Sequence, residues 1–298
     1  MVAFFAVVEG VRSRLGRRKQ PISSYRGFRV LITGASSGIG KELALQYAAK
    51  GCRLILAARR TQLLEEVRVE CLQRGAAGVL LSTTDVTQLE EVRAMVQLAA
   101  DSWDGGIDLL VLNAGRSCVS EYANLAIGAV REVVELNIYG CLYPTYYALP
   151  HLRKAGGTIL AISSLAGIGW SPMRTVYCAS KHALYGFFNA LRAEEPSVTV
   201  CLAYPGYVWS EIHDKAITQE GVKLERQVAQ FMPTEVCVRS LIEGVHQGRR
   251  DIYPEPLRAR AGRWLAALFP EIVDFVGAHA SNSGIKKIPD PDAKPKHN

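Results

Sequence analysis

Short apolar segments alternate with amphipathic segments along most of the chain. The apolar segments are rich in β-branched residues, and most are closely followed by Gly, Ser, Asp or Pro; they span residues 28–33, 53–58, 78–83, 107–113, 158–163 and 198–204. Between them, apolar residues recur at helical spacing, as over residues 40–49, 62–74 and 88–100. This alternation is typical of buried parallel strands connected by helices.

The pattern therefore predicts an α/β fold of the Rossmann type, a doubly wound and mostly parallel sheet flanked by helices. The chain has 298 residues, 49% of them hydrophobic, which is enough for one large domain. No internal repeat or Pro/Gly-rich linker interrupts the alternation. We expect a dinucleotide-binding catalytic domain over residues 26–255, an apolar and then basic leader at residues 1–25, and an amphipathic extension with a disordered tail at residues 256–298.

The segment 257–279 combines large apolar side chains with arginines and is interrupted by Pro270, which predicts two short helices. Its apolar residues are Leu257, Trp264, Leu265, Leu268, Phe269, Ile272, Phe275 and Val276. Such a helical extension either contacts a membrane or covers a binding site, or it packs on the domain. The sequence does not separate these alternatives.

The charge is +7 at neutral pH, and basic clusters lie near both ends beside apolar segments. No zinc-finger spacing, aromatic RNA-binding motif or basic zipper accompanies them, so we expect no nucleic-acid partner and favour a membrane surface. No stretch reaches the roughly 20 apolar residues that span a bilayer. The last residues, Lys-Pro-Lys-His-Asn, resemble a dilysine retrieval signal. They predict a peripheral protein on the cytosolic side of the endoplasmic reticulum, with the cytoplasm and the mitochondrion as alternatives.

The seven cysteines are odd in number, include no C-x-x-C pair and lie mostly in apolar runs. This pattern predicts buried free thiols in a reducing compartment, and we expect no metal site.

A glycine-rich turn follows the first apolar segment. Residues 33–40 read Thr-Gly-Ala-Ser-Ser-Gly-Ile-Gly and lead into a helical pattern. Small residues there let the backbone approach a pyrophosphate, and the N-terminus of the next helix offers free N–H groups. The turn predicts a dinucleotide site formed by Gly34, Ser36, Ser37, Gly38, Ile39 and Gly40.

Tyr177 and Lys181 stand four residues apart in a helical stretch, so their side chains share one helix face. A nearby ammonium favours the phenolate form of a tyrosine and makes it a usable acid/base. Together with the Thr-Gly-x-x-x-Gly-x-Gly turn, this Tyr-x-x-x-Lys spacing resembles the short-chain dehydrogenase/reductase family. The resemblance covers about residues 26–255.

The resemblance implies a catalytic tetrad of Asn137, Ser164, Tyr177 and Lys181. In the family, the serine holds the substrate oxygen, and the backbone of the asparagine positions a water beside the lysine. Ser163 should point the other way from Ser164, because side chains alternate along a strand. Each residue alone has an ordinary structural explanation; their order and spacing together favour the catalytic one.

Further cofactor contacts are implied by the same resemblance. Asp85 and Val86 would line the adenine, although Asp85 could instead cap Thr87. The segment Asn113, Ala114 and Gly115 would steady the sheet and line the adenosine ribose. The nicotinamide would be held by Pro205, Gly206, Val208 and Ser210.

The end of the second strand selects the cofactor. It reads Ala-Ala-Arg-Arg, without the carboxylate that would accept from a ribose 2′-hydroxyl. Arg59 attracts a 2′-phosphate instead, so we expect NADP(H), although Arg59 could be a solvated helix-start residue. Many NADP-using relatives also carry a basic residue at the position that Ser37 occupies here.

The block 162–194 is similar to the 11β-hydroxysteroid dehydrogenase and dehydrogenase/reductase member 7 branch of the family. This implies a lipophilic carbonyl or alcohol substrate, such as a steroid, a retinoid or another lipid, and a homodimer or homotetramer. The expected substrate walls are Tyr207, Trp209, Ile212 and Phe231, with Leu165, Trp170 and Met173 opposite. The alternatives are a catalytically silent cofactor-binding scaffold or a membrane-associated structural protein on the same fold.

Overall fold

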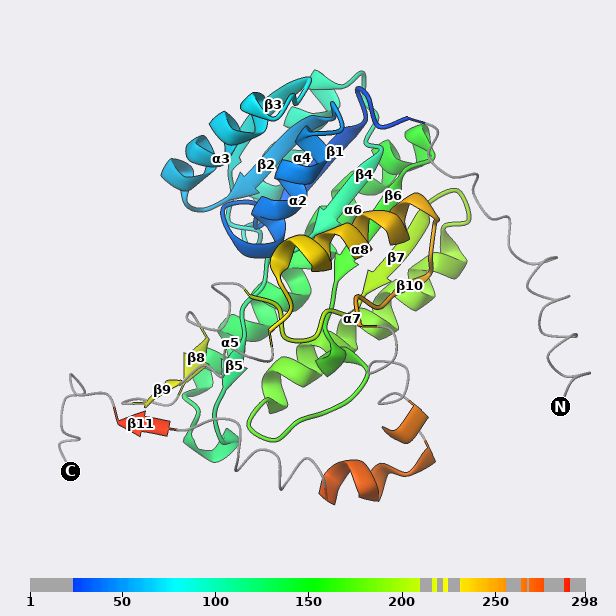
Figure 1. Cartoon of the computed structure of the whole chain (residues 1–298). Helices are drawn as coiled ribbons and strands as arrows, with labels where there is room; N and C mark the ends of the chain where they lie inside the picture. Colours follow the sequence, from blue (N-terminus) through cyan, green and yellow to red (C-terminus); the bar gives the residue numbers. More distant parts are fainter. Residues whose placement is uncertain are drawn as a thin grey trace, which may run out of the picture.

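The computed structural model describes residues 24–209, 216–218, 222–224, 231–255, 264–266, 268–275 and 287–289. A seven-stranded sheet runs through the molecule in the order β10-β7-β6-β4-β1-β2-β3, and all its neighbouring strands pair in parallel (Figure 1). Its strands are β1 Arg29–Thr33, β2 Arg53–Ala58, β3 Gly78–Thr83, β4 Leu109–Leu112, β6 Thr158–Ile162, β7 Thr199–Ala203 and β10 Asp251–Ile252. The predicted doubly wound fold is confirmed.

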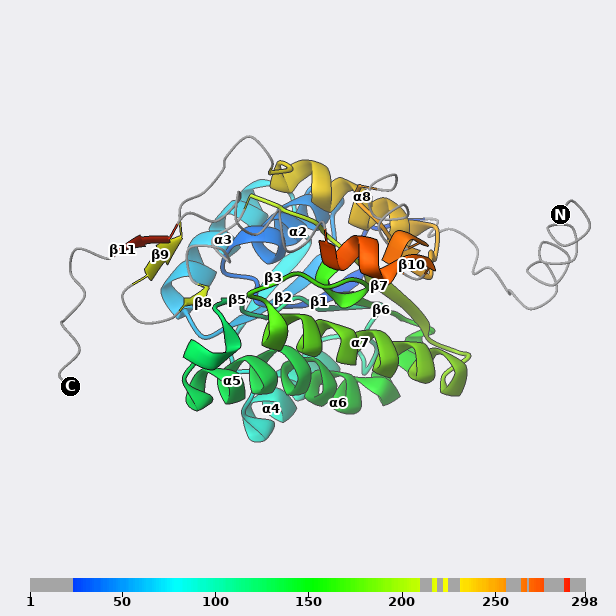
Figure 2. The ribbon, with the colours of Figure 1, turned by 90° about the horizontal axis from the view of Figure 1, so that it is seen from below.

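Helices cover both faces of this sheet (Figure 2). One face carries α2 Gly38–Ala48, α3 Thr61–Gln73 and α8 Thr234–His246, and the other carries α4 Leu89–Ser102, α6 Gly140–Ala155 and α7 Thr175–Glu194. The helix α5 Ile127–Val134 continues through a π-helical turn, η2 Glu135–Tyr139, into α6. Two three-residue 3-10 turns, η1 Tyr122–Asn124 and η3 Leu165–Gly167, lie in the loops that follow β5 (Cys118–Val119) and β6.

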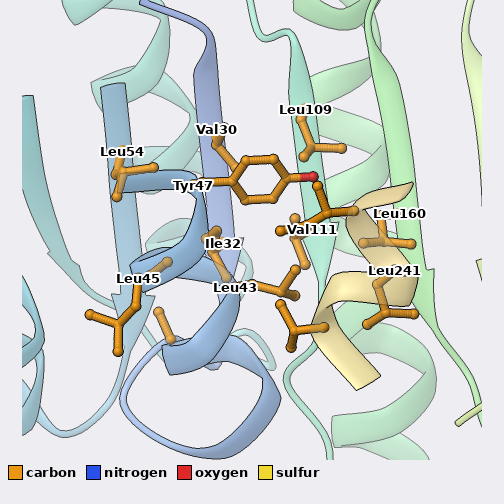
Figure 3. Packing of buried hydrophobic residues seen from close by; sticks show 14 of the residues in the cluster. Val30, Ile32, Leu43, Leu45, Tyr47, Leu54, Leu109, Val111, Leu160 and Leu241 are labelled. Carbon is orange, nitrogen blue, oxygen red and sulfur yellow. The ribbon is translucent and has the colours of Figure 1, made fainter. Parts of the chain in front are cut away.

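The core explains why the central strands are mostly apolar. Val30 and Ile32 of β1 face the α2 side, where Tyr47 lies among leucines and valines of the sheet (Figure 3). Leu31, between them, belongs to the cluster on the other face. Because side chains of a strand alternate and both faces are covered, every position of β4 and β6 is buried.

Two small additional sheets lie outside the main one. β5 Cys118–Val119 pairs with β8 Ile217–Thr218 in parallel, and β9 Val222–Leu224 pairs with β11 Lys287–Pro289 in an antiparallel ladder. β11 lies in the C-terminal tail, and its ladder hydrogen bonds pair it with β9 although the composition of that segment alone predicts no structure.

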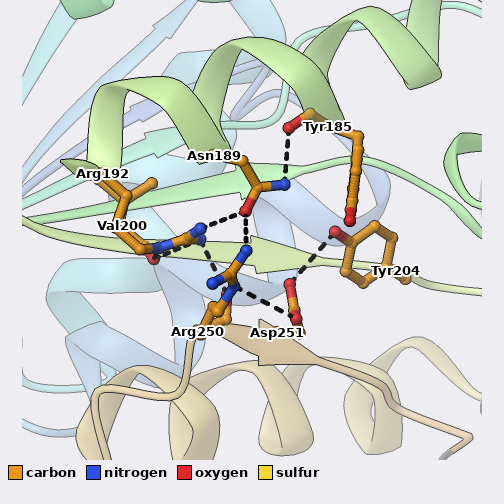
Figure 4. Close-up of polar contacts among 7 residues, drawn as sticks. All are labelled: Tyr185, Asn189, Arg192, Val200, Tyr204, Arg250 and Asp251. Carbon is orange, nitrogen blue, oxygen red and sulfur yellow. Dashed lines mark hydrogen bonds and ion pairs between the residues drawn. The ribbon is translucent and has the colours of Figure 1, made fainter. Parts of the chain in front are cut away.

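The edge strand β10 is joined to α7 by a polar cluster (Figure 4). Arg192 of α7 donates to the carbonyl oxygen of Val200 on β7 and to that of Arg250, which precedes β10. Arg250 in turn donates to Asn189 Oδ1. Asp251 accepts from the hydroxyl of Tyr204 at 3.3 Å. The cluster therefore connects the last helix of one face to the edge of the sheet.

All seven cysteines are free and buried, as predicted. Burial raises the pKa of the Cys141 thiol to about 11 and that of the Cys237 thiol to about 12, so the thiolates that react with oxidants are scarce at neutral pH.

Within the described part of the C-terminal extension, residues 264–266 and 270–275 are helical and Phe269 is not, in agreement with a break at Pro270. Several of its large apolar side chains are exposed, among them Trp264, Leu268 and Phe275. Trp170 Nε1 donates to Asp274 Oδ1 at 2.6 Å, which ties this segment to the loop that follows β6. In the part of the chain that the structure describes, no helix combines the length and the apolar character needed to cross a bilayer.

Candidate active site

The glycine turn joins β1 to α2 as the sequence predicts. Gly34 has a φ of +64°, a left-handed conformation that favours glycine. A side chain at Gly40 could not be accommodated, because its Cβ would lie 2.3 Å from the carbonyl oxygen of Gly34. The first turn of α2 thus packs directly against the turn that leads into it.

The N-terminus of α2 fits an anion. The N–H groups of Gly38, Ile39 and Gly40 have no backbone acceptor among the described residues. The first turn carries no acidic side chain, and Ser37 at the N-cap does not accept from the helix with its hydroxyl. Unsatisfied N–H groups and the partial positive charge of a helix N-terminus suit a pyrophosphate.

Asn113 holds the carboxyl ends of β1 and β4 together. Its Nδ2 donates to the carbonyl oxygens of Thr33 and Gly34, both at 3.1 Å. Thr33 Oγ1 accepts from the backbone N–H groups of Asn113 at 3.0 Å and of Ala114 at 3.2 Å. These two strands lie side by side at the switch point of the sheet, where open α/β folds bind their ligands.

Two arginines follow β2, and their side chains contact different parts of the site. Arg59 is exposed, and its Nη1 lies 3.6 Å from Asp85 Oδ2. Arg60 Nη2 donates to Ser36 Oγ at 2.9 Å and to Ser37 Oγ at 2.8 Å. A guanidinium therefore lies beside the glycine turn, next to the position where NADP-using relatives carry a basic residue. Arg60 was not among the cofactor residues expected from the sequence, although it directly follows Arg59.

Asp85 builds a local turn. Its Oδ1 accepts from the backbone N–H of Thr87 at 3.0 Å and from the Thr87 hydroxyl at 2.8 Å. This is the capping alternative, and an adenine contact of Asp85 stays a prediction. Val86 is buried and lies against Gly140, where an added Cβ would meet Val86 Cγ2 at 2.8 Å.

Tyr177 and Lys181 lie on one face of α7, and both are buried. Lys181 Nζ is 5.8 Å from the centroid of the Tyr177 ring. It donates to the carbonyl oxygen of Ile162, at the end of β6, over 3.0 Å. The ammonium is therefore held near the phenol by a backbone acceptor. His182 turns back to its own helix, with Nδ1 2.9 Å from the carbonyl oxygen of Cys178.

Asn137 sits fully buried in the π-helical turn η2. Its side chain accepts from the N–H of Arg116 at 2.8 Å and donates to the carbonyl oxygen of Arg116 and to Ser180 Oγ. Ser180 Oγ donates to the carbonyl oxygen of Tyr177 at 2.8 Å, so Asn137 is linked to the helix that carries Tyr177 and Lys181. An added Cβ at Gly115 would lie 3.1 Å from Asn137 Oδ1 and 3.5 Å from Lys181 Nζ, which brings these three residues together. π-Turns are frequent at functional sites.

The two serines after β6 point in different directions, as expected from strand alternation. Ser163 is buried, and its hydroxyl donates to the carbonyl oxygen of Lys181 at 3.2 Å. Ser164 caps η3, where its Oγ accepts from Ala166 N–H at 3.2 Å and lies 3.5 Å from the carbonyl oxygen of Pro205. Ser164 is the half-exposed member of the pair.

The segment after β7 adjoins Ser164. Leu165 N–H donates to the carbonyl oxygen of Pro205 at 3.1 Å, and an added Cβ at Gly206 would lie 3.3 Å from Leu165 Cδ1. Val208 is buried and pairs with Met232. Ser210, like Ile212 of the expected substrate wall, lies outside the described residues.

Aromatic side chains follow on the same segment. The Phe231 ring lies 5.6 Å from that of Tyr207 and 6.0 Å from that of Trp209, centroid to centroid. Tyr207, Trp209 and Trp170 are all partly exposed. These aromatic side chains thus lie close together beyond Gly206, and their role as a substrate wall stays a prediction.

The residues fit a nicotinamide dinucleotide. Glycine and helix N–H groups face the position of a pyrophosphate, arginines follow β2, and a buried Tyr–Lys pair lies at the carboxyl ends of the neighbouring strands. In such a site the Tyr177 hydroxyl can exchange a proton with a bound alcohol or carbonyl compound, and the Lys181 ammonium can assist it.

Comparison with known proteins agrees with this geometry. A family model described as short chain dehydrogenase matches residues 29–221. The protein named "Dehydrogenase/reductase SDR family protein 7-like" of Dictyostelium discoideum is 36% identical over 276 residues, which are 91% of this chain and 87% of that protein. "Dehydrogenase/reductase SDR family member 7" of Mus musculus is 38% identical over 234 residues, with 75% of this chain and 69% of its own length covered. "11-beta-hydroxysteroid dehydrogenase-like 4A" of Arabidopsis thaliana is 33% identical, covering 82% of this chain and 81% of its own.

Two solved structures share the fold. A short-chain dehydrogenase/reductase of Burkholderia phymatum in complex with NAD superposes with a TM-score of 0.73, at 22% identity, over 85% of this chain and 96% of that chain. An alcohol dehydrogenase of Thermococcus sibiricus complexed with 5-hydroxy-NADP gives a TM-score of 0.69, also at 22% identity, over 76% and 95% of the two chains. At this identity the likeness concerns the fold alone.

Proposed function

Because the chain belongs to the short-chain dehydrogenase/reductase family, we propose that it is an NADP(H)-dependent oxidoreductase acting on a lipophilic carbonyl or alcohol. The observation that carries the proposal is the buried pair of Tyr177 and Lys181 on α7, linked to Asn137 through Ser180 and lying beside Gly115. A protein that only binds the cofactor has no need of a buried lysine aimed at a buried tyrosine.

Each residue of the tetrad has a distinct task in this proposal. The nicotinamide, when bound, supplies or accepts the hydride. Tyr177 Oη gives a proton to the substrate oxygen during reduction and takes it back during oxidation. Ser164 Oγ hydrogen-bonds the same substrate oxygen and fixes its position. Lys181 Nζ stabilises the phenolate, and Asn137 holds the helix turn beside them.

The preference for NADP(H) rests on charge at the end of β2. Arg59 and Arg60 provide two guanidinium groups, and no carboxylate follows the strand. Arg60, bonded to Ser37 Oγ, supplies the cation that the sequence lacks at residue 37 itself. Guanidinium groups bind a phosphate through paired hydrogen bonds, whereas a ribose hydroxyl gains little from them.

The lipophilic substrate is supported by the aromatic residues Tyr207, Trp209 and Phe231 beyond Gly206. Aromatic walls with few polar groups suit an apolar carbonyl compound. The names of the relatives, which include a hydroxysteroid dehydrogenase-like protein, favour the same class.

Peripheral contact with the endoplasmic reticulum membrane is also part of the proposal. Its support is the exposed Trp264, Leu268 and Phe275 in the C-terminal extension, together with the basic residues of the sequence around it. The homodimer or homotetramer expected from the resemblance stays a prediction. Tyr139, at the end of η2, and Tyr146, on α6, are exposed and offer a surface for it.

The test is whether the full chain reduces a panel of steroid, retinoid, fatty and sphingoid carbonyls with NADPH. The loss of NADPH absorbance measures the reaction. We expect at least one lipophilic carbonyl to be reduced and the small polar carbonyls to be poor substrates. Tight NADPH binding with no reduction of any panel member would favour the catalytically silent scaffold instead.

A further inference from the structure

Arg174 lies at the catalytic end of α7, and the proposed reaction gives it no task. Its Cζ is 5.9 Å from the centroid of the Tyr177 ring and 5.7 Å from that of the Tyr207 ring. Its Nη1 donates to Ser117 Oγ at 3.3 Å. The guanidinium thus stands between the catalytic tyrosine and the first aromatic residue of the expected substrate wall.

This cation is not neutralised by the groups around it in the described part of the chain. The neighbouring Arg116 takes the carboxylate of Glu132, while Arg174 forms no ion pair with any described residue. Arg174 is half-buried, so water screens its charge only in part. Ring faces stabilise a guanidinium, but they do not use the paired N–H donors of its planar edge.

The backbone just before Arg174 is held in an unfavourable conformation. Met173 has a φ of +64°, which costs a residue with a side chain about 1 kcal/mol. Its carbonyl oxygen accepts from Ser120 N–H at 2.8 Å, which fixes the turn against the segment after β5. Backbone strain of this kind persists mainly where it positions a functional group. Here it sets the direction of the Arg174 side chain at the N-cap of α7.

We propose that Arg174 binds a carboxylate of the substrate, so that the protein selects lipophilic oxo acids and hydroxy acids over neutral carbonyl compounds. A carboxylate matches the forked donors of a guanidinium. The Tyr207 ring would lie along the apolar body of the molecule, and Tyr177 would face its reacting oxygen. This inference rests on the proposed function for the reaction, but the binding preference can be measured separately from turnover.

The experiment uses the full chain and a series of oxo fatty acids that differ in the separation of ketone and carboxylate, each paired with its methyl ester. Calorimetry on the protein loaded with NADP+, which cannot reduce a ketone, gives the affinity of each member. NADPH oxidation in a separate assay gives kcat/KM. We expect the best-matched acid to bind at least about tenfold more tightly than its ester, since hydrogen bonds to a charged group are strong. Arg174→Met should bring the acid-to-ester ratio close to one, and Arg174→Lys should restore only part of it.

The control is Arg93→Met on the exposed surface of α4, which removes the same charge and should leave the ratio as in the wild type. Equal affinities of acid and ester for the wild type, throughout the series, would overturn the proposal without any variant. So would an Arg174→Met protein that folds and keeps the acid preference. If acids bind preferentially but no member is reduced, the carboxylate site stands and the proposed reaction fails.

Discussion

Buried polar side chains around Tyr177 and Lys181 leave little freedom to either residue. Lys181 Nζ is held by the carbonyl oxygen of Ile162, and Ser180 connects Asn137 with the backbone at Tyr177. Since burial separates these groups from water, their interactions are stronger than at a surface. Removal of the Tyr177 hydroxyl should therefore leave the surrounding side chains in place.

Replacement of Tyr177 by phenylalanine should remove turnover and keep the cofactor site. The phenol oxygen supplies the proton, whereas the ring packs without it, so we expect a loss of roughly 100- to 10,000-fold in kcat. The Kd for NADPH, measured by fluorescence, should change less than about threefold. Tyr146→Phe, at an exposed position of α6, is the matched control. A Tyr177→Phe enzyme that kept a substantial part of the wild-type rate would falsify the mechanism.

The arginines after β2 should set the cofactor preference. The wild type is expected to prefer NADPH over NADH, and Arg59→Asp to reverse this, because a carboxylate repels the 2′-phosphate and accepts from a ribose hydroxyl. Arg60→Met should also weaken NADPH binding while affecting NADH less. The readout is the ratio of kcat/KM for the two cofactors.

Arg74→Asp introduces the same charge change at the other end of α3 and should leave that ratio unchanged. Equal use of NADPH and NADH by the wild type would contradict the assignment. An effect of Arg59 but none of Arg60 would assign the phosphate to Arg59 alone.

At the scale of elements, the two ends of α7 have different roles. Its first turns carry Tyr177 and Lys181, and its last turns carry Asn189 and Arg192, which reach β7 and the start of β10 (Figure 4). Partial burial lowers the pKa of the Arg192 guanidinium. The helix that carries Tyr177 and Lys181 is thus fixed at its far end by the edge of the sheet.

Arg192→Met should destabilise the fold by about 2–3 kcal/mol, because the carbonyl oxygens of Val200 and Arg250 lose a donor. Arg192→Lys should recover only part of this, since an ammonium cannot reach several acceptors in the plane of a guanidinium. Urea unfolding of the full chain gives the free energies. Arg131→Met on the exposed side of α5 is the control. Equal stabilities of Arg192→Met and Arg131→Met would show that the cluster contributes little.

At the scale of the whole molecule, the described helical part of the C-terminal extension lies toward the end to which the strands point (Figure 1). The helical segment 270–275, orange in Figure 1, lies at that end, and Asp274 bonds Trp170 beyond β6. Exposed aromatic and aliphatic residues therefore gather on the side of the molecule that holds the site. A lipophilic substrate would pass between a membrane and the site along this side.

Binding to membranes should be reversible and should depend on this extension. Apolar insertion combined with basic residues, each worth about 1 kcal/mol near an anionic surface, predicts that high salt releases part of the protein and detergent the rest. The checks are fractionation of cells that express the full chain and flotation with anionic liposomes. The triple variant Trp264→Glu, Leu268→Glu and Phe275→Glu should abolish flotation, and Leu72→Glu on α3 should not. Recovery of the wild type wholly in the soluble fraction at low salt would defeat the proposal.

The sequence alone located most of the main sheet and the local chemistry. Apolar runs predicted six of its strands, β1, β2, β3, β4, β6 and β7, because strands buried on both faces are mostly apolar. The short strands β5 and β10 were not predicted. The glycine turn and the Tyr-x-x-x-Lys spacing were equally local, since neighbours along the chain fix them. The predicted strands were one or two residues too long at an end, as at the start of β1 and β4, because Phe28 and Ile107 are apolar although they precede the paired residues.

Only the tertiary structure decided contacts between residues far apart in the chain. It placed Arg60, rather than Arg59, against Ser36 and Ser37, because neighbouring side chains leave a strand end in different directions. It also brought Arg174 between Tyr177 and Tyr207, which no spacing could reveal. β11 was found in the same way, through its pairing with β9. Pairings of this kind depend on how elements pack, and packing is a property of the whole fold rather than of any segment.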